Sequence, residues 1–274
     1  MPRSKYSAAV RKTVSELVPM DDDMFQKICE NKATCQELIS TILGEPITVI
    51  EVIPQDSIKK LQGRSVRLDC LCRLADGTYV NVEVQKANDD DHQARVHYNA
   101  AVVAANRTPK GKKFKDVAKV MVIYITSFDI FAGKLPIYHV DRTVRETGLK
   151  TDNGFEEIYV NTAVKNYDSP LNRDVSDLMD LFVDRVTFNT EKFPEFSKRK
   201  NQFINTTKGV NEMCSKVEQL VKEEKMINLF DYVQKGGMTV SFAASEACLT
   251  PKDFREQMRM NGYTIPSKSR KATV

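Results

Sequence analysis

Two stretches with alternating polar and apolar residues, separated by a short turn, constrain the fold of this chain more than any other feature. Residues 65–74 and residues 79–85 each have an apolar side chain at every second position. The segment Ala75-Asp76-Gly77 between them has the composition of a tight turn. Successive side chains point to opposite faces of a strand, so the pattern predicts an antiparallel β-hairpin with one apolar face.

The length of the turn decides which residues face each other across the hairpin. A two-residue turn would place Asp69 opposite Val84 and mix charged with apolar side chains on each face. A three-residue loop that ends at Gly77 pairs Cys70 with Val82 and produces one clean apolar face. We therefore expect the three-residue loop.

The other face of the hairpin gathers the charged residues. In the favoured register Asp69 lies opposite Glu83, and Arg67 lies opposite Gln85, with opposed β-carbons about 5 Å apart. Two carboxylates that close repel each other, so either one is protonated or a cation lies between them. Oxygen ligands favour Mg²⁺ or Mn²⁺, which can promote phosphodiester hydrolysis. The alternative is a solvated edge hairpin in which Arg67 neutralises the acids.

The residues before the hairpin have apolar side chains at helical spacing. Residues 22–43 predict two consecutive short helices, and Gly44 is a natural end for the second one. Thr34 and Glu37 have the spacing of a capping box at the start of that second helix. Asp22 and Glu37 are also candidates for extra metal ligands, but capping is the stronger interpretation for Glu37.

A strand before the hairpin, and a helix and a buried strand after it, complete the predicted core. These three segments are residues 47–53, 91–107 and 120–126. The predicted order from residue 22 to residue 126 is therefore helix, three strands, helix and strand. Towards the C-terminus the pattern becomes helical, and its last two short helices fit either a helix-turn-helix or, more simply, a small helical appendage.

Composition narrows the class of protein. A charged fraction of 28% and a hydrophobic fraction of 41% fit a globular protein. No apolar run approaches the roughly 20 residues that span a bilayer, and no signal-peptide pattern follows Met1, so we expect a cytoplasmic protein. The six cysteines lack the spacing of zinc motifs, and we expect Cys70 and Cys72 to be buried, reduced thiols.

Basic residues are clustered although the net charge is only +4. The longest cluster follows the predicted helix 91–107 and includes Lys110, Lys112 and Lys113. Such clusters bind phosphates, but they also occur on ordinary surfaces. Arg95 and Tyr98 share one face of the helix before this cluster, where they either contact phosphate or support the hairpin.

Together these segments resemble the PD-(D/E)XK nucleases, whose motif has the form D-x(n)-E-x-K. The resemblance is closer to the branch of recombination-promoting nucleases and putative transposases, and it covers about residues 20–130. The segments that support it are Asp22-Asp23-Met24-Phe25, Asp69, Asp76-Gly77, Glu83-Val84-Gln85 and Arg95-Val96-His97-Tyr98. It implies an α/β, restriction-endonuclease-like αβββαβ core with a mixed sheet, plus a helical C-terminal segment. The expected division is a nuclease-like domain over residues 20–200 and a helical appendage over residues 205–274.

The resemblance also implies roles for individual residues. Asp69 and Glu83 would bind Mg²⁺ or Mn²⁺, and the backbone carbonyl of Val84 would complete the metal ligands. Gln85 takes the position of the family's lysine as a third catalytic residue, but it has no charge. Lys86 is next to it in sequence but is expected on the opposite face. The residues expected to contact nucleic acid are Arg67, Arg95, Tyr98, Lys110, Lys112 and Lys113.

The sequence thus favours a metal-dependent DNA endonuclease associated with transposition or recombination. The first alternative is a nucleic-acid-binding protein with a catalytically weak or inactive nuclease fold, which the uncharged Gln85 motivates. The second is an interaction protein whose C-terminal helices bind a protein partner. DNA is the expected partner, no membrane is expected, and a homo-oligomer is compatible with the sequence.

Overall fold

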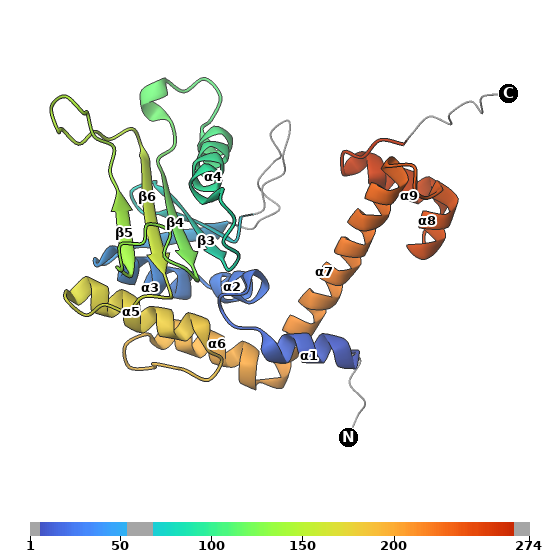
Figure 1. Ribbon diagram of the computed structural model, residues 1–274, viewed down its shortest axis with the longest axis horizontal. Helices are drawn as coiled ribbons and strands as arrows, with labels where there is room; N and C mark the ends of the chain where they lie inside the picture. Colours follow the sequence, from blue (N-terminus) through green and yellow to red (C-terminus); the bar gives the residue numbers. More distant parts are fainter. Residues whose placement is uncertain (1–5, 54–67, 266–274) are drawn as a thin grey trace. The chain divides into compact units, whose positions relative to one another are not determined.

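A mixed six-stranded β-sheet lies at the centre of the larger of two compact units (Figure 1). The computed structural model describes residues 6–53 and 68–265. One unit is Arg11–Met213, and the other combines Met1–Val10 with Cys214–Val274. The strands are β1 (Val49–Ile53), β2 (Cys70–Leu74), β3 (Tyr79–Gln85), β4 (Val120–Thr126), β5 (Ile137–Val140) and β6 (Phe155–Asn161). Their order is β1-β2-β3-β4-β6-β5, with β3, β4 and β6 parallel and the other pairs antiparallel.

The hairpin of β2 and β3 has the register that its polarity predicts. Cys70 pairs with Val82 and Cys72 pairs with Val80. Gly77 adopts a φ of +92°, a left-handed conformation that glycine reaches without strain, and its N–H donates to the carbonyl of Leu74. The three-residue loop is therefore confirmed.

Helices cover both faces of the sheet. The helix α4 (His92–Arg107) connects the parallel strands β3 and β4, and its Val96, Ala100 and Val103 pack against Val122 and Tyr124 of β4. On the opposite side, α2 (Asp22–Cys29) and α3 (Lys32–Leu43) contact β3 and β1, and α5 (Pro170–Val183) and α6 (Pro194–Asn205) pack against α3. The helices and strands from α3 to β4 follow the αβββαβ order of the expected core, and the predicted fold class is confirmed.

Aromatic rings join the helices of the second face. Phe182 of α5 lies between Phe25 of α2 and Phe196 of α6, with ring centroids 5.9 and 4.9 Å away. Lys200 of α6 is fully buried and donates to three backbone carbonyls around the end of α5, those of Leu181, Asp184 and Thr187. The ammonium is thereby satisfied by hydrogen bonds as a buried charge must be.

The predicted capping box at the start of α3 is wrong. The N-cap is Asn31, whose side-chain oxygen accepts a hydrogen bond of 3.0 Å from the N–H of Thr34. Glu37 instead accepts from the N–H groups of Glu195 and Phe196, at 3.1 and 2.7 Å, and so caps α6. An anion is stabilised at the N-terminus of a helix, even though burial raises the pKa of Glu37. Glu37 is therefore a cap for a distant helix, and its carboxylate is engaged there.

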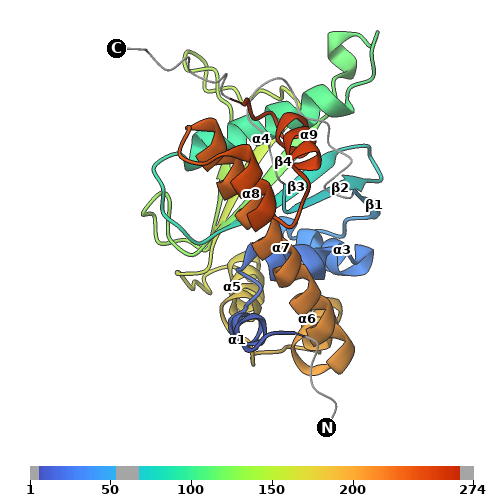
Figure 2. The same ribbon diagram turned by 90° about the vertical axis from the view of Figure 1, so that its right-hand side faces the viewer.

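The smaller unit is helical. Its helices include most of α7 (Thr207–Gln234) with α8 (Val240–Glu246) and α9 (Pro251–Met260), while α1 (Ala8–Glu16) lies across the boundary of the two units. In Figure 2, α8 and α9 pack beside the end of α7. Their core consists of Leu229, Phe230, Val233, Ala243, Ala244, Phe254 and Met258. None of the helices in the described residues is both long and apolar enough to span a bilayer.

Candidate active site

Asp69 lies directly before β2, where the hairpin register extended by one residue places it opposite Glu83. Two donors fix its carboxylate. The backbone N–H of Val84 donates to Oδ2 at 3.1 Å, and the side-chain amide of Gln26 in α2 donates to Oδ1 at 3.2 Å. Each oxygen of the carboxylate thus accepts a hydrogen bond from the protein. The Asp69 carboxylate is therefore positioned by the protein and only partly buried.

Glu83 lies on the face of β3 that α4 covers and is only 7% exposed. The side-chain amide of Asn81 donates to Oε1 of Glu83 at 2.8 Å. Burial and then the charge of Asp69 raise the pKa of Glu83 well above its usual value, and the charge of Asp22 acts in the same direction. A buried carboxylate beside a second carboxylate is stable only when it is protonated or when a cation binds between the two. We call Asp69 and Glu83 the acid site.

Gln85 shares a face of β3 with Glu83, and α4 holds its side chain. Arg95 donates through Nη1 to the amide oxygen of Gln85 at 3.1 Å, and the amide nitrogen of Gln85 donates to the carbonyl of Ala87 at 3.0 Å. Arg95 also lies 3.4 Å from the carboxylate of Asp91. Of the two roles predicted for Arg95, contact with the hairpin is therefore observed.

Tyr124 of β4 lies beside Glu83 in the parallel pairing of β3 with β4. Its hydroxyl lies 3.1 Å from Nδ1 of His92, whose Nε2 lies 3.1 Å from the side-chain oxygen of Asn88. Burial is the largest influence on Tyr124 and raises the pKa of its hydroxyl, which therefore remains a neutral phenol. Tyr124, His92 and Asn88 thus form a hydrogen-bonded chain that begins beside Glu83.

The donors at the acid site fit a hard divalent cation. Two carboxylates are available, and Mg²⁺ is often bound by one or two carboxylates while water and substrate phosphates complete its octahedron. Over residues 6–53 and 68–265, the one set of three His, Cys, Asp or Glu ligand atoms within 4.8 Å of one another is made of cysteines. A cation at the acids would therefore need oxygen ligands beyond the side chains, such as water, a backbone carbonyl or a phosphate oxygen.

Lys86 follows β3, and its ammonium forms an ion pair with Asp21, the N-cap of α2. Asp21 also accepts the N–H of Val18 at 2.8 Å. The positive charge of Lys86 is thus engaged next to Asp22 rather than at the amide of Gln85. That Lys86 does not take the catalytic role of the family's lysine stays a prediction.

The basic loop after α4 lies at the other end of the helix from Arg95. Lys110, Lys112 and Lys113 are exposed, and the ring of Phe114 is 97% exposed beside them. The loop begins near the start of β3, because the guanidinium of Arg107 lies 5.8 Å from the ring centroid of Tyr79. Glu83 is four residues further along β3, which is about 13 Å at the rise of a strand. Arg67, the remaining basic residue expected at the acids, lies outside the described residues.

Two polar residues that the sequence analysis did not select hold the two acids. Asn81 could have been found, because it is two positions before Glu83 and so shares its face of β3. Gln26 could have been found from its position four residues after Asp22, on the same face of α2. Their donor amides explain how the carboxylates keep fixed positions.

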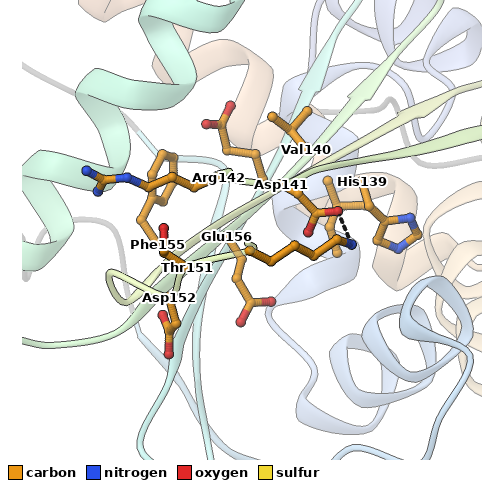
Figure 3. A pocket seen from close by; sticks show the side chains of 11 residues that line it. His139, Val140, Asp141, Arg142, Thr151, Asp152, Phe155 and Glu156 are labelled. Atoms are coloured by element: carbon orange, nitrogen blue, oxygen red, sulfur yellow. Dashed lines mark ion pairs between the residues drawn. The ribbon is translucent and has the colours of Figure 1, made fainter. Parts of the chain in front are cut away.

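A separate hollow of about 340 Å³ lies along β5 and β6, two strands away from β3 (Figure 3). Charged side chains make up about half of its lining, and Asp141 forms an ion pair with Lys150. The residues that line it come mostly from the β5–β6 segment. The acid site has no residue in this hollow.

Comparison with known proteins gives one match. Residues 22–180 match a family model described as a PD-(D/E)XK nuclease family transposase. No curated protein and no solved structure matches the chain. The matched segment is more than half of the 274 residues and contains α2, the β2–β3 hairpin and α4, and therefore every residue of the acid site.

Proposed function

Because the chain belongs to the PD-(D/E)XK nuclease family of transposases, we propose that it is a metal-dependent DNA endonuclease that acts in transposition or recombination. The observation that supports this most is the burial of Glu83 beside the charge of Asp69. Such an arrangement costs free energy in the absence of a counter-ion. It is therefore expected where a cation is to be bound.

Asp69 and Glu83 would hold Mg²⁺ or Mn²⁺, with the backbone carbonyl of Val84 as a further ligand. When bound, the ion supplies a polarised phosphoryl oxygen and a more acidic water. Gln26 and Asn81 keep the two carboxylates in place, since each donates one hydrogen bond to an acid. Gln85 orients a water or a phosphate oxygen, and Arg95 positions the amide of Gln85.

A second candidate function is DNA binding by a nuclease fold that has lost turnover. The observation that favours it is the state of Gln85, whose amide oxygen and nitrogen both already have partners within the protein. An amide also offers no positive charge to a developing phosphate anion. In that case the protein would bind DNA without cutting it.

DNA would extend from the acid site along α4 to the basic loop. The distance of about 13 Å or more between Glu83 and the loop corresponds to at least about four base pairs at 3.4 Å each. Lys110, Lys112 and Lys113 would contact the phosphate backbone at that distance. The exposed ring of Phe114 offers a surface on which an unpaired base can stack.

The test is nicking of supercoiled plasmid by the full chain with Mg²⁺, with Mn²⁺ and with EDTA. We expect cleavage with either ion, none with EDTA, and none by Asp69→Asn or Glu83→Gln. Binding of the same DNA in Ca²⁺ at several salt concentrations separates the two candidates. Salt-dependent binding without cleavage in any divalent ion supports the inactive fold, and cleavage by Asp69→Asn at the wild-type rate contradicts the assigned site.

A further inference from the structure

Four cysteines meet on the face of the hairpin opposite the acid site. Cys29 is the last residue of α2, Cys35 lies in the first half of α3, and Cys70 and Cys72 lie on β2. All four are free thiols and none is more than 4% exposed. We call these four residues the thiol cluster.

Three of the four sulfur atoms lie at distances that a single tetrahedral ion can span, and the fourth is in contact with one of them. Sγ of Cys70 lies 3.7 Å from Sγ of Cys35 and 3.6 Å from Sγ of Cys72. The sulfurs of Cys29, Cys35 and Cys70 all lie within 4.8 Å of one another, whereas the sulfur of Cys72 lies outside this set of three and would have to move closer to complete a tetrahedron. With a Zn–S bond of about 2.3 Å, the edge of a tetrahedron of four sulfurs is about 3.8 Å.

We propose that the thiol cluster binds one Zn²⁺ ion as a structural site. Each cysteine gives up its thiol proton to solvent and becomes a thiolate ligand, so four protons leave as one ion enters. Cys35 also gives up the hydrogen bond that its thiol donates to the carbonyl of Cys29 at 2.9 Å. The four ligands come from α2, α3 and β2, and they close the site to solvent, as structural zinc sites require.

The alternatives explain less of the geometry. An iron–sulfur cluster places several iron and sulfide atoms between its thiolates, and contacts of 3.6 and 3.7 Å leave room for one ion. Simple packing of thiols accounts for burial, but it gives no reason for three sulfurs from three elements to converge within 4.8 Å. The hydrogen bond with Cys35 lowers the pKa of the Cys72 thiol, but the hydrogen bond with Cys70 and burial together raise it above its usual value, so without a metal this thiol is neutral and a poor nucleophile.

Zinc at this position would also support the acid site. Cys70 follows Asp69 directly, and Cys29 lies three residues after Gln26, which donates to Asp69. An ion between β2 and α2 would hold the strand that carries Asp69 against the helix that positions its carboxylate. The zinc site does not depend on the proposed nuclease activity.

The experiment is metal analysis of the full chain, purified under reducing conditions without chelators. We expect one zinc per chain in the wild type, in Asp69→Asn and in Cys248→Ser, because Cys248 is an exposed cysteine of the other unit. We expect less than a tenth of that amount in Cys35→Ser and Cys72→Ser. Failure of Asp69→Asn to cut DNA while it keeps zinc would separate the two proposals.

Cobalt gives a second measurement that needs no variant. Replacement of the zinc by Co²⁺ in the wild-type chain is expected to produce the thiolate-to-cobalt charge-transfer and visible bands of a tetrahedral four-sulfur site. Reduced, folded protein that binds neither zinc nor Co²⁺ overturns the proposal. So does a disulfide between Cys35 and Cys70, or a visible spectrum of bound iron and sulfide in the purified protein.

Discussion

The two faces of the β2–β3 hairpin differ in the kind of ligand atom that they present. On one face Asp69 and Glu83 offer hard oxygen atoms, and Asp69 is partly exposed, so a substrate could reach it. On the other face Cys70 and Cys72 offer soft sulfur atoms that are closed off by α2 and α3. Oxygen ligands suit Mg²⁺ and thiolates suit Zn²⁺. Because side chains alternate along a strand, one residue step from Asp69 to Cys70 separates an open site from a closed one.

The largest expected effect is a loss of DNA cleavage when the acid site is changed. Asp69→Asn removes a charged ligand but can keep the hydrogen bond from Val84 N–H, so we expect the fold to remain and cleavage to fall by about a thousandfold or more. The measurement is the single-turnover rate of plasmid nicking in Mg²⁺. The matched control is Asp76→Asn in the turn of the same hairpin, where an amide oxygen can still accept the N–H of Thr78. Equal loss in both variants would contradict a specific role for Asp69.

Removal of each metal ion should have a different effect on the stability of the protein. Withdrawal of zinc from the thiol cluster is expected to lower the free energy of unfolding by about 3 kcal/mol and the unfolding midpoint by roughly 5–10 °C. Withdrawal of Mg²⁺ alone should leave the midpoint nearly unchanged, because a weakly bound ion at an open site adds little at ordinary concentrations. Thermal unfolding of the full chain with a zinc-selective chelator, and separately without Mg²⁺, measures both. Equal shifts would remove the distinction between a structural and a catalytic ion.

Substitution of Gln26 tests how far the acid site depends on support from α2. Gln26→Ala removes the donor to Oδ1 of Asp69, and loss of such a supporting bond typically costs 10- to 100-fold, so we expect a loss of about that size in cleavage. The apparent affinity for Mg²⁺ should weaken by a similar factor, whereas the zinc content should stay at one per chain. Gln93→Ala, an exposed position on α4, is the control. A normal Mg²⁺ titration in Gln26→Ala would show that Asp69 needs no such support.

The smallest expected effect is a gain in stability from Glu83→Gln. The folded-state pKa of Glu83 is raised, so this carboxyl lowers the stability of the metal-free protein increasingly as the pH rises from the pKa of the unfolded chain to the folded-state pKa. Below the pKa of the unfolded chain no cost remains. At neutral pH without divalent ions, the variant should be more stable than wild type by about 1–2 kcal/mol. The advantage should shrink as the pH falls into the acidic range. Urea unfolding at several pH values measures it, and a destabilised variant at neutral pH would argue against a strained acid pair.

The hairpin could be predicted from sequence because its information is local. Alternation over a few residues decided the pairing of Cys70 with Val82, and the same pattern placed Glu83 and Gln85 on one face. Glu37 could not be placed, because the helix that it caps lies 158 residues away and only the folded chain brings the two together. Local spacing suggested a cap for the nearest helix, where the shorter side chain of Asn31 already accepts the bond.

The thiol cluster shows the same limit. Cys70 and Cys72 are buried and free as predicted, but zinc motifs are recognised by short spacings, and here the four cysteines come from three separate elements.

The distance between the basic loop and Glu83 could not be predicted for a related reason. A helix of 16 residues is about 24 Å long, so residues that follow it in sequence lie at the far end of the sheet.

The most direct measurement for the central claim is anomalous diffraction from crystals of the full chain soaked in Mn²⁺. The account predicts a manganese peak bound by one carboxylate oxygen each of Asp69 and Glu83, and no such peak in crystals of Glu83→Gln. A saturating soak that leaves the two acids without a peak, or that puts the ion on other residues, would contradict the assignment of this hairpin as the metal-dependent site.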